Sequence, residues 1–221
     1  MRSVLTGIGA AVAMAALLTG CGGGDGGEAT KAPEGGLTAA EACGGFAKAP
    51  ETSAALKAVL GGERFEDDLS KPEKALDRLR EDAAAPWSDS YRPQPVKYCG
   101  LQSAAEAARN LKIEVNAVGK GPYLGPELAD KVTSYTSGLE AFTSSGVGHV
   151  YFTCRLKAPA HEITVEMTVW GPAGVPDTDM EQRTRLITLA NAAARDVSAK
   201  LGCQGEDGLA TGVPAPAATT S

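Results

Sequence analysis

The sequence has few of the residues, and none of the motifs, on which common enzymatic chemistry depends. Only two histidines occur among its 221 residues, and no HExxH, CxxC or GxSxG pattern is present. The glycine-rich run at 22–27 permits a GxGxxG match, but it has no strand before it and cannot form a dinucleotide site. We therefore expect neither a metal site nor a bound cofactor.

Positive charge is also scarce. Lysine and arginine total 21 against 27 aspartates and glutamates, so the net charge is −6. A mildly acidic protein is poorly suited to bind phosphate backbones or anionic lipid head groups. The composition therefore argues against nucleic-acid binding.

No apolar run is long enough to cross a bilayer, which takes about 20 residues. The longest, Val4–Leu18, follows the single charge of Arg2 and ends at small residues, as a secretory signal does. The sequence Leu18-Thr19-Gly20-Cys21 resembles the lipobox of bacterial lipoproteins. That resemblance implies cleavage after Gly20 and addition of diacylglycerol to the Cys21 thiol. The alternative is an ordinary secretory signal with a chance cysteine.

The remaining chain divides by composition. Residues 1–20 form the expected signal peptide, and 21–36 form the lipidated cysteine and a glycine-rich tether, with an average span of about 20 Å. Residues 37–203 are enough for one domain with its own core. The tail at 204–221 is rich in Gly, Pro, Ala and Thr without hydrophobic periodicity, which predicts disorder. A protein so anchored lies on the extracytoplasmic face of the cell membrane.

Four cysteines remain beside Cys21, namely Cys43, Cys99, Cys154 and Cys203. An even number in an exported chain indicates disulfides, and four cysteines allow three pairings. We favour Cys43–Cys99 and Cys154–Cys203, each of which closes a loop of roughly 50 residues.

Hydrophobic periodicity predicts helices first and strands later. Capping-box patterns at Thr38–Glu41 and Ser70–Glu73 precede helical spacing, and a further short helix is expected over 52–60. Strict alternation predicts strands over 111–117, 150–156 and 163–169, with weaker ones near 96–101 and 131–136. A long amphipathic helix then runs to Leu201. Because it and the hairpin each hide an apolar face, they should pack together, which brings Cys203 to Cys154.

These elements predict an α+β domain: short N-terminal helices, an antiparallel sheet of about four to five strands, and a long C-terminal helix packed on the sheet. The order resembles that of small actinobacterial lipoproteins of unassigned function. The resemblance rests on Cys43, Cys99, the strand from Leu111 and the terminal helix, and the second cysteine pair departs from it.

The polar face of the predicted hairpin carries the candidate site residues. A catalytic pair or metal site can be drawn from His149 or His161 with Glu162 or Glu166, but a solvated histidine on a strand face is the far commoner explanation. Tyr151 and Trp170 lie on the same face and form a possible recognition patch.

The leading interpretation is a non-enzymatic, membrane-anchored lipoprotein that binds an envelope protein, peptidoglycan or a small ligand. One alternative is a small cell-envelope hydrolase that uses a histidine and a carboxylate. Another is a sensor or accessory subunit of an envelope complex.

Overall fold

The computed structural model describes residues 35–85, 88, 93–105, 109–121, 123–205 and 207–218. The expected signal peptide, Cys21 and most of the tether lie outside the described residues, as do Trp87 and Tyr91. The helical segments are the 3₁₀ helix η1 (Ala42–Gly44), α1 (Pro50–Leu60), α2 (Pro72–Ala84), α3 (Pro126–Ala129) and α4 (Met180–Leu201). The strands are β1 (Phe65–Asp67), β2 (Val96–Ser103), β3 (Asn110–Val118), β4 (Thr133–Thr136), β5 (Glu140–Thr143), β6 (Val147–Arg155), β7 (Glu162–Trp170) and β8 (Ala215–Pro216).

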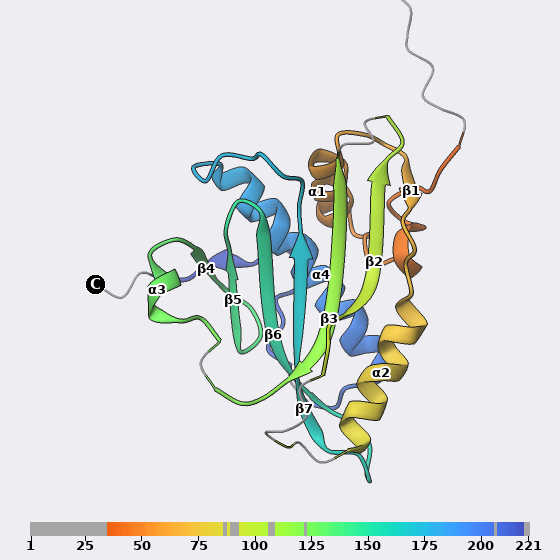
Figure 1. Ribbon diagram of the computed structural model, residues 1–221, viewed down its shortest axis with the longest axis vertical. Helices are drawn as coiled ribbons and strands as arrows, with labels where there is room; N and C mark the ends of the chain where they lie inside the picture. Colours follow the sequence, from red (N-terminus) through yellow and green to blue (C-terminus); the bar gives the residue numbers. More distant parts are fainter. Residues whose placement is uncertain are drawn as a thin grey trace, which may run out of the picture. The chain divides into compact units, whose positions relative to one another are not determined.

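The predicted α+β class is confirmed, but the predicted four to five strands are too few. The described strands form one eight-stranded antiparallel sheet in the order β1-β2-β3-β7-β6-β5-β4-β8 (Figure 1). The predicted hairpin is its centre, where β6 and β7 pair in unbroken register from Val147↔Trp170 to Arg155↔Glu162. The missed strands β1, β5 and β8 are two to four residues long, too short to show a period of two.

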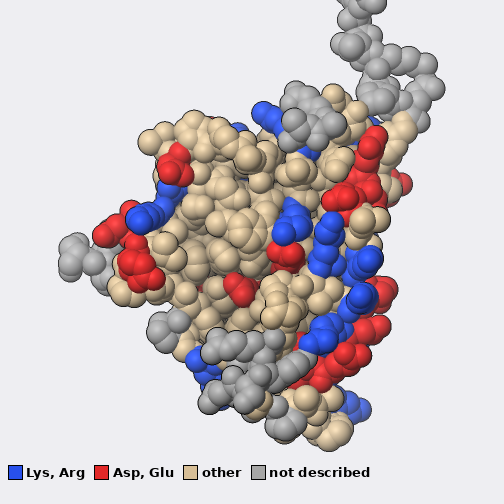
Figure 2. Space-filling model, viewed as in Figure 1, with Lys and Arg blue, Asp and Glu red and all other residues tan. Residues whose placement is uncertain are grey.

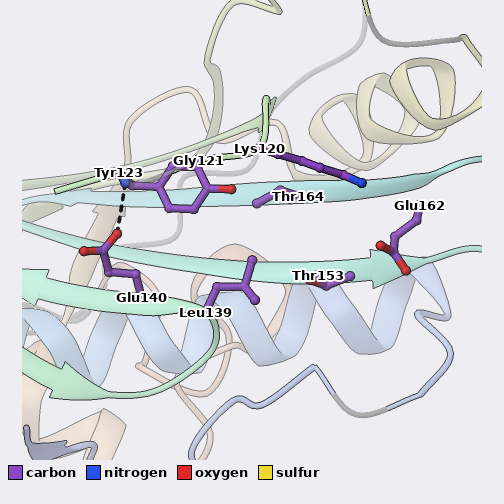
Figure 3. Close-up of a pocket in the computed structure, with 8 residues that line it drawn as sticks. All are labelled: Lys120, Gly121, Tyr123, Leu139, Glu140, Thr153, Glu162 and Thr164. Carbon is purple, nitrogen blue, oxygen red and sulfur yellow. Dashed lines mark hydrogen bonds between the residues drawn. The ribbon is translucent and has the colours of Figure 1, made fainter.

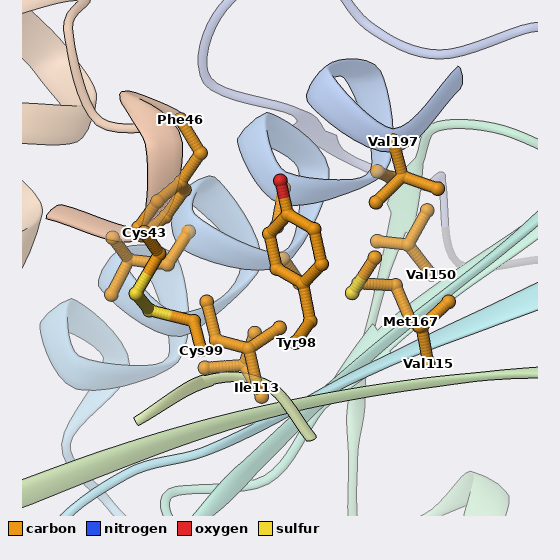
Figure 4. Close-up of a cluster of buried hydrophobic side chains, with 14 of the residues drawn as sticks. Cys43, Phe46, Tyr98, Cys99, Ile113, Val115, Val150, Met167 and Val197 are labelled. Atoms are coloured by element: carbon orange, nitrogen blue, oxygen red, sulfur yellow. A yellow bond between two sulfur atoms is a disulfide. The ribbon is translucent and has the colours of Figure 1, made fainter. Parts of the chain in front are cut away.

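The three longer helices lie on one face of this sheet. The helix α4 contacts β5, β6, β7 and α1, while α2 contacts β2, β3 and β7. Between these helices and the sheet lies one hydrophobic core, part of which Figure 4 shows around Tyr98 and Met167. No helix among the described residues combines the length and apolarity needed to cross a bilayer.

Two disulfides connect the helical layer and the N-terminal segment to the sheet. They join Cys43 to Cys99 and Cys154 to Cys203, with Cα–Cα distances of 5.4 and 4.9 Å. This is the pairing favoured from the sequence. The first lies in the core beside Phe46 (Figure 4) and fixes η1 to β2. The second fixes the end of α4 to β6.

The N-terminal segment enters the sheet at its β1 edge. Leu37 and Phe65 exchange two backbone hydrogen bonds, of 2.7 and 3.0 Å, as an isolated antiparallel bridge. The Glu41 carboxylate accepts bonds from both the amide and the hydroxyl of Thr38, at 2.8 Å each, so only one half of the predicted capping box forms. Only the short helix η1 follows, because Gly44 and Gly45 both adopt left-handed backbone angles.

The second predicted capping box is wrong. The residue before α2 is Lys71, and no side chain caps this helix. The Ser70 hydroxyl instead bonds the backbone of Gly100 in β2, accepting from its N–H at 2.9 Å and donating to its carbonyl at 3.1 Å. The serine therefore secures the chain before α2 to the sheet.

The C-terminal segment differs from the predicted disordered tail. Residues 215–216 form β8 against β4, and the Ala217 amide donates to the Ser134 carbonyl at 2.9 Å. The buried Asn191 of α4 holds the preceding loop, since its amide nitrogen donates to the carbonyls of Ala210 and Gly212, both at 2.9 Å. Specific polar contacts thus order a segment that has no hydrophobic periodicity.

Candidate functional site

The candidate site lies on the sheet face opposite the helices, here called the open face. Its side chains come from alternate positions of the central strands, chiefly Asn116 on β3, Glu166 and Thr168 on β7, and His149 and Tyr151 on β6. In Figure 2, which views this face, uncharged groups cover much of the surface, a few acidic and basic groups lie among them near the middle, and larger clusters of both signs lie at the sides. Polar and aromatic groups therefore gather where the three nine-residue strands β3, β7 and β6 lie side by side.

Glu166 is the centre of a hydrogen-bond network on this face. Its Oε1 accepts a bond from the Tyr151 hydroxyl at 2.6 Å and lies 3.1 Å from Nδ1 of His149. The antiparallel register places Tyr151 directly opposite Glu166, and His149 opposite Thr168. The predicted hairpin faces therefore bring His149 and Glu166 together.

The network shifts the pKa values of two of its members. Burial by itself would raise the pKa of Glu166, but the hydrogen bonds from His149 and Tyr151 outweigh it and leave the pKa below its ordinary value. Burial, aided by the hydrogen bond to Glu166, raises the pKa of Tyr151 well above its usual range. Glu166 is therefore an ionised acceptor and Tyr151 a neutral donor.

The substitution Glu166→Gln tests this charge. Because the pKa is lower in the folded chain, ionisation of Glu166 stabilises the fold above pH 4.5, its ordinary value, and this stabilisation is lost as the pH falls through the folded value. We expect the variant to lose about 1–3 kcal/mol of unfolding free energy at pH 7. The difference from the wild type should shrink below pH 4.5, measured by urea unfolding across a pH series.

A matched control is Glu114→Gln. The Glu114 carboxylate lies on the same face but outside the network, and it accepts a hydrogen bond from the Trp170 indole at 2.9 Å. A Glu166→Gln deficit that stays constant from neutral to acidic pH would show that shape, and not charge, accounts for the loss.

The arrangement around His149 lacks the geometry of a catalytic triad. The Thr168 hydroxyl lies 3.3 Å from Nδ1 of His149, the same nitrogen that contacts Glu166. A histidine base uses one ring nitrogen toward the nucleophile and the other toward the carboxylate. The ring also stacks on Phe142, with centroids 4.9 Å apart. These contacts fit a histidine that organises the surface.

The other predicted candidates lie elsewhere on the hairpin. His161 is exposed in the β6–β7 turn, and its amide donates to the Ala83 carbonyl at the end of α2. Glu162 forms an ion pair with Arg155, at 2.8 Å. Neither joins the network around Glu166.

The predicted Tyr151–Trp170 patch is not one exposed surface. Tyr151 is only 6% exposed because Tyr123 stacks on it, with ring centroids 4.1 Å apart and planes 8° from parallel. Trp170 is 44% exposed and lies beside Lys112, whose ammonium is 5.3 Å from the ring centroid. Tyr123, which covers Tyr151, is therefore the aromatic residue that faces solvent at this place on the open face.

A depression of about 400 Å³ adjoins Tyr123 on this face. Figure 3 shows Lys120 and Tyr123 along one side, Glu140 near Tyr123, and the threonines Thr153 and Thr164 between the walls. The Glu140 carboxylate accepts a hydrogen bond from the Tyr123 amide at 3.1 Å, which fixes the backbone of Tyr123 beside β5. The volume lies within the range of about 300–1,000 Å³ typical of small-molecule sites.

Sequence reasoning missed Tyr123, Phe142 and Glu140. Tyr123 belongs to the segment between β3 and α3, and the other two belong to the four-residue strand β5. The only sequence signal for them is the polar face of the neighbouring hairpin, which indicates that something must pack on Tyr151. No group of three or more His, Cys, Asp or Glu side chains suited to a metal ion occurs in the described parts of the chain.

The chain was compared with protein families, curated proteins and solved structures. No family model, curated protein or solved structure matches it.

Proposed function

We propose that the protein is a membrane-anchored lipoprotein of the cell envelope that binds a ligand on its open face. The observation that carries the proposal is the ordered cluster around Glu166, which lies on the sheet face opposite the three longer helices. Two buried aromatics, Phe142 and Tyr151, lie on this face outside the main hydrophobic core. Such a rigid surface of aromatic rings and fixed polar groups is typical of recognition sites.

The lipobox-like sequence supports the anchor. A diacylglycerol on Cys21 supplies two acyl chains, the number that stable anchoring requires. The two disulfides accord with an oxidising location outside the cytoplasm. Binding is favoured over hydrolysis because Glu166 and Thr168 converge on one nitrogen of His149.

Replacement of Cys21 by serine tests the anchor. Without the thiol no diacylglycerol can be attached, so we expect the protein to move from the membrane fraction to the soluble extracytoplasmic fraction. Immunoblots of fractionated cells measure this, with the exposed substitution Leu128→Ala as a control that keeps the acceptor thiol and both disulfides. Membrane retention of the Cys21→Ser protein would refute the lipid anchor.

The binding face is tested by site-specific photocrosslinking on intact cells. A photoreactive amino acid at Trp170 probes the open face, and one at the exposed Arg195 of α4 probes the helical side. We expect a discrete adduct from position 170 and none from position 195. Equal capture from both positions, or capture only from α4, would contradict the proposed face.

A further inference from the structure

The depression beside Tyr123 has a composition that selects a chemical class of ligand. Its floor contains the cross-strand pair Thr153↔Thr164, from β6 and β7. Each hydroxyl both donates and accepts hydrogen bonds. A floor of this kind matches a ligand whose own groups do the same, which is the property of sugar hydroxyls.

The ring of Tyr123 has a fixed position at one end of the depression, with its hydroxyl edge toward Thr164 (Figure 3). It stacks on Tyr151 on its inner side, and its hydroxyl donates to the Gly119 carbonyl at 3.0 Å. These two contacts hold the ring in one orientation before any ligand arrives. A preorganised aromatic surface lowers the entropic cost of binding and offers an apolar plane to the C–H face of a pyranose ring.

The carboxylates of the depression are already held in place. Glu140 accepts from the amides of Tyr123 and Leu124, at 3.1 and 3.2 Å. Glu162 accepts from Arg155, at 3.1 and 2.8 Å. A carboxylate accepts about four hydrogen bonds, so each retains capacity for a ligand hydroxyl in a defined position.

The charges around the depression balance. Glu140 and Glu162 are offset by Lys120, which lines the depression, and by Arg155, which is paired with Glu162. A strongly anionic or cationic ligand would therefore meet as much repulsion as attraction. The threonines and charged side chains likewise disfavour a purely apolar ligand.

We propose that this depression binds a neutral oligosaccharide, with one pyranose ring against Tyr123 and the hydroxyls of the neighbouring sugar unit on Thr153 and Thr164. The inference rests on the proposed function, since it specifies the ligand of the open face. The source is either the glycan of the cell wall or a soluble oligosaccharide, which share this chemistry.

Saturation-transfer difference NMR on the full mature chain tests the proposal. The probes are three tetrasaccharides: β-1,4-linked N-acetylglucosamine, cellotetraose and maltotetraose. We expect transfer to the ring protons of at least one, with the first reporting the wall-type glycan and the other two soluble glucans. Absence of transfer to all three would overturn the proposal.

Variants then locate the site. Tyr123→Ala should weaken binding by about tenfold, whereas Tyr123→Phe, which keeps the ring, should bind nearly as well as the wild type. A Thr153→Val/Thr164→Val variant keeps the β-branched shape and should weaken binding severalfold. Leu128→Ala is the exposed control. Binding that survives in both the Tyr123→Ala and the double-valine variants would place the sugar elsewhere and refute this site.

The two proposals fail separately. If none of the tetrasaccharides binds but position 170 still forms its adduct on cells, the open face is a binding surface for another class of ligand and the carbohydrate assignment is wrong. If neither is observed, the proposed function itself fails.

Discussion

Joint replacement of Cys154 and Cys203 by alanine is expected to lower the midpoint of thermal unfolding by about 8–16 °C. The bond spans a sequence separation of 49 residues. In the chain-entropy model a loop of this length contributes about 4 kcal/mol, which it does by restricting the unfolded chain. That is a large share of the typical net stability of about 5–15 kcal/mol.

The position of this bond explains why the loss should be global. Cys154 is fully buried on the core side of β6, and Cys203 lies two residues after Leu201, the last residue of α4. The bond therefore joins the central hairpin to the helix that covers it. Differential scanning calorimetry in non-reducing buffer measures the effect.

Reduction provides the control. A reductant breaks both disulfides of the wild type and the remaining Cys43–Cys99 bond of the variant, so under reducing conditions the two midpoints should converge. An unchanged midpoint for the variant in non-reducing buffer would contradict the prediction, and so would a large difference that persists after reduction.

The second large effect is expected from Asn191→Leu, which should reduce the free energy of unfolding by about 2–4 kcal/mol. Asn191 is 1% exposed and accepts a bond from the Ser137 hydroxyl at 2.6 Å in addition to its two donated bonds. Leucine removes this partner from the buried Ser137 hydroxyl and from the carbonyls of the half-buried Ala210 and Gly212. Each such group costs about 1–3 kcal/mol when it stays unsatisfied, and relaxation recovers part of that.

The same substitution should release the C-terminal segment. Residues 207–218 depend on Asn191, on the bond from the Gly138 amide to the Gly208 carbonyl at 2.8 Å, and on the two-residue strand β8. We expect limited proteolysis to remove this segment faster from the variant than from the wild type. Arg195→Leu, an exposed site on the same helix, is the control. Equal proteolysis of Asn191→Leu and wild-type protein would show that the tail is held by other contacts.

The central hairpin was predictable because its strands are long and alternate strictly. With nine residues each, β6 and β7 sort apolar side chains to the core and polar ones to the open face. That sorting places His149, Tyr151 and Glu166 together. What it does not reveal is that Nδ1 of His149 meets both Thr168 and Glu166, since that depends on side-chain orientation.

The edges of the sheet and the outer wall of the site were beyond sequence reasoning. The two- to four-residue strands β1, β5 and β8 gain their stability from neighbouring strands and from single contacts such as those of Asn191. Tyr123 lies outside any strand and is positioned by stacking on Tyr151. Long-range contacts of this kind leave no local periodicity.

The bridge between Leu37 and Phe65 has a mechanical consequence. Traction applied from the N-terminal side reaches this two-bond bridge first, at the outermost strand, and would peel it away at low force. Peeling then stops at Cys43, where the load passes through a covalent bond to β2. The disulfide thereby keeps η1 on β2 after the bridge is lost, so traction from the N-terminal side does not unravel the chain beyond Cys43.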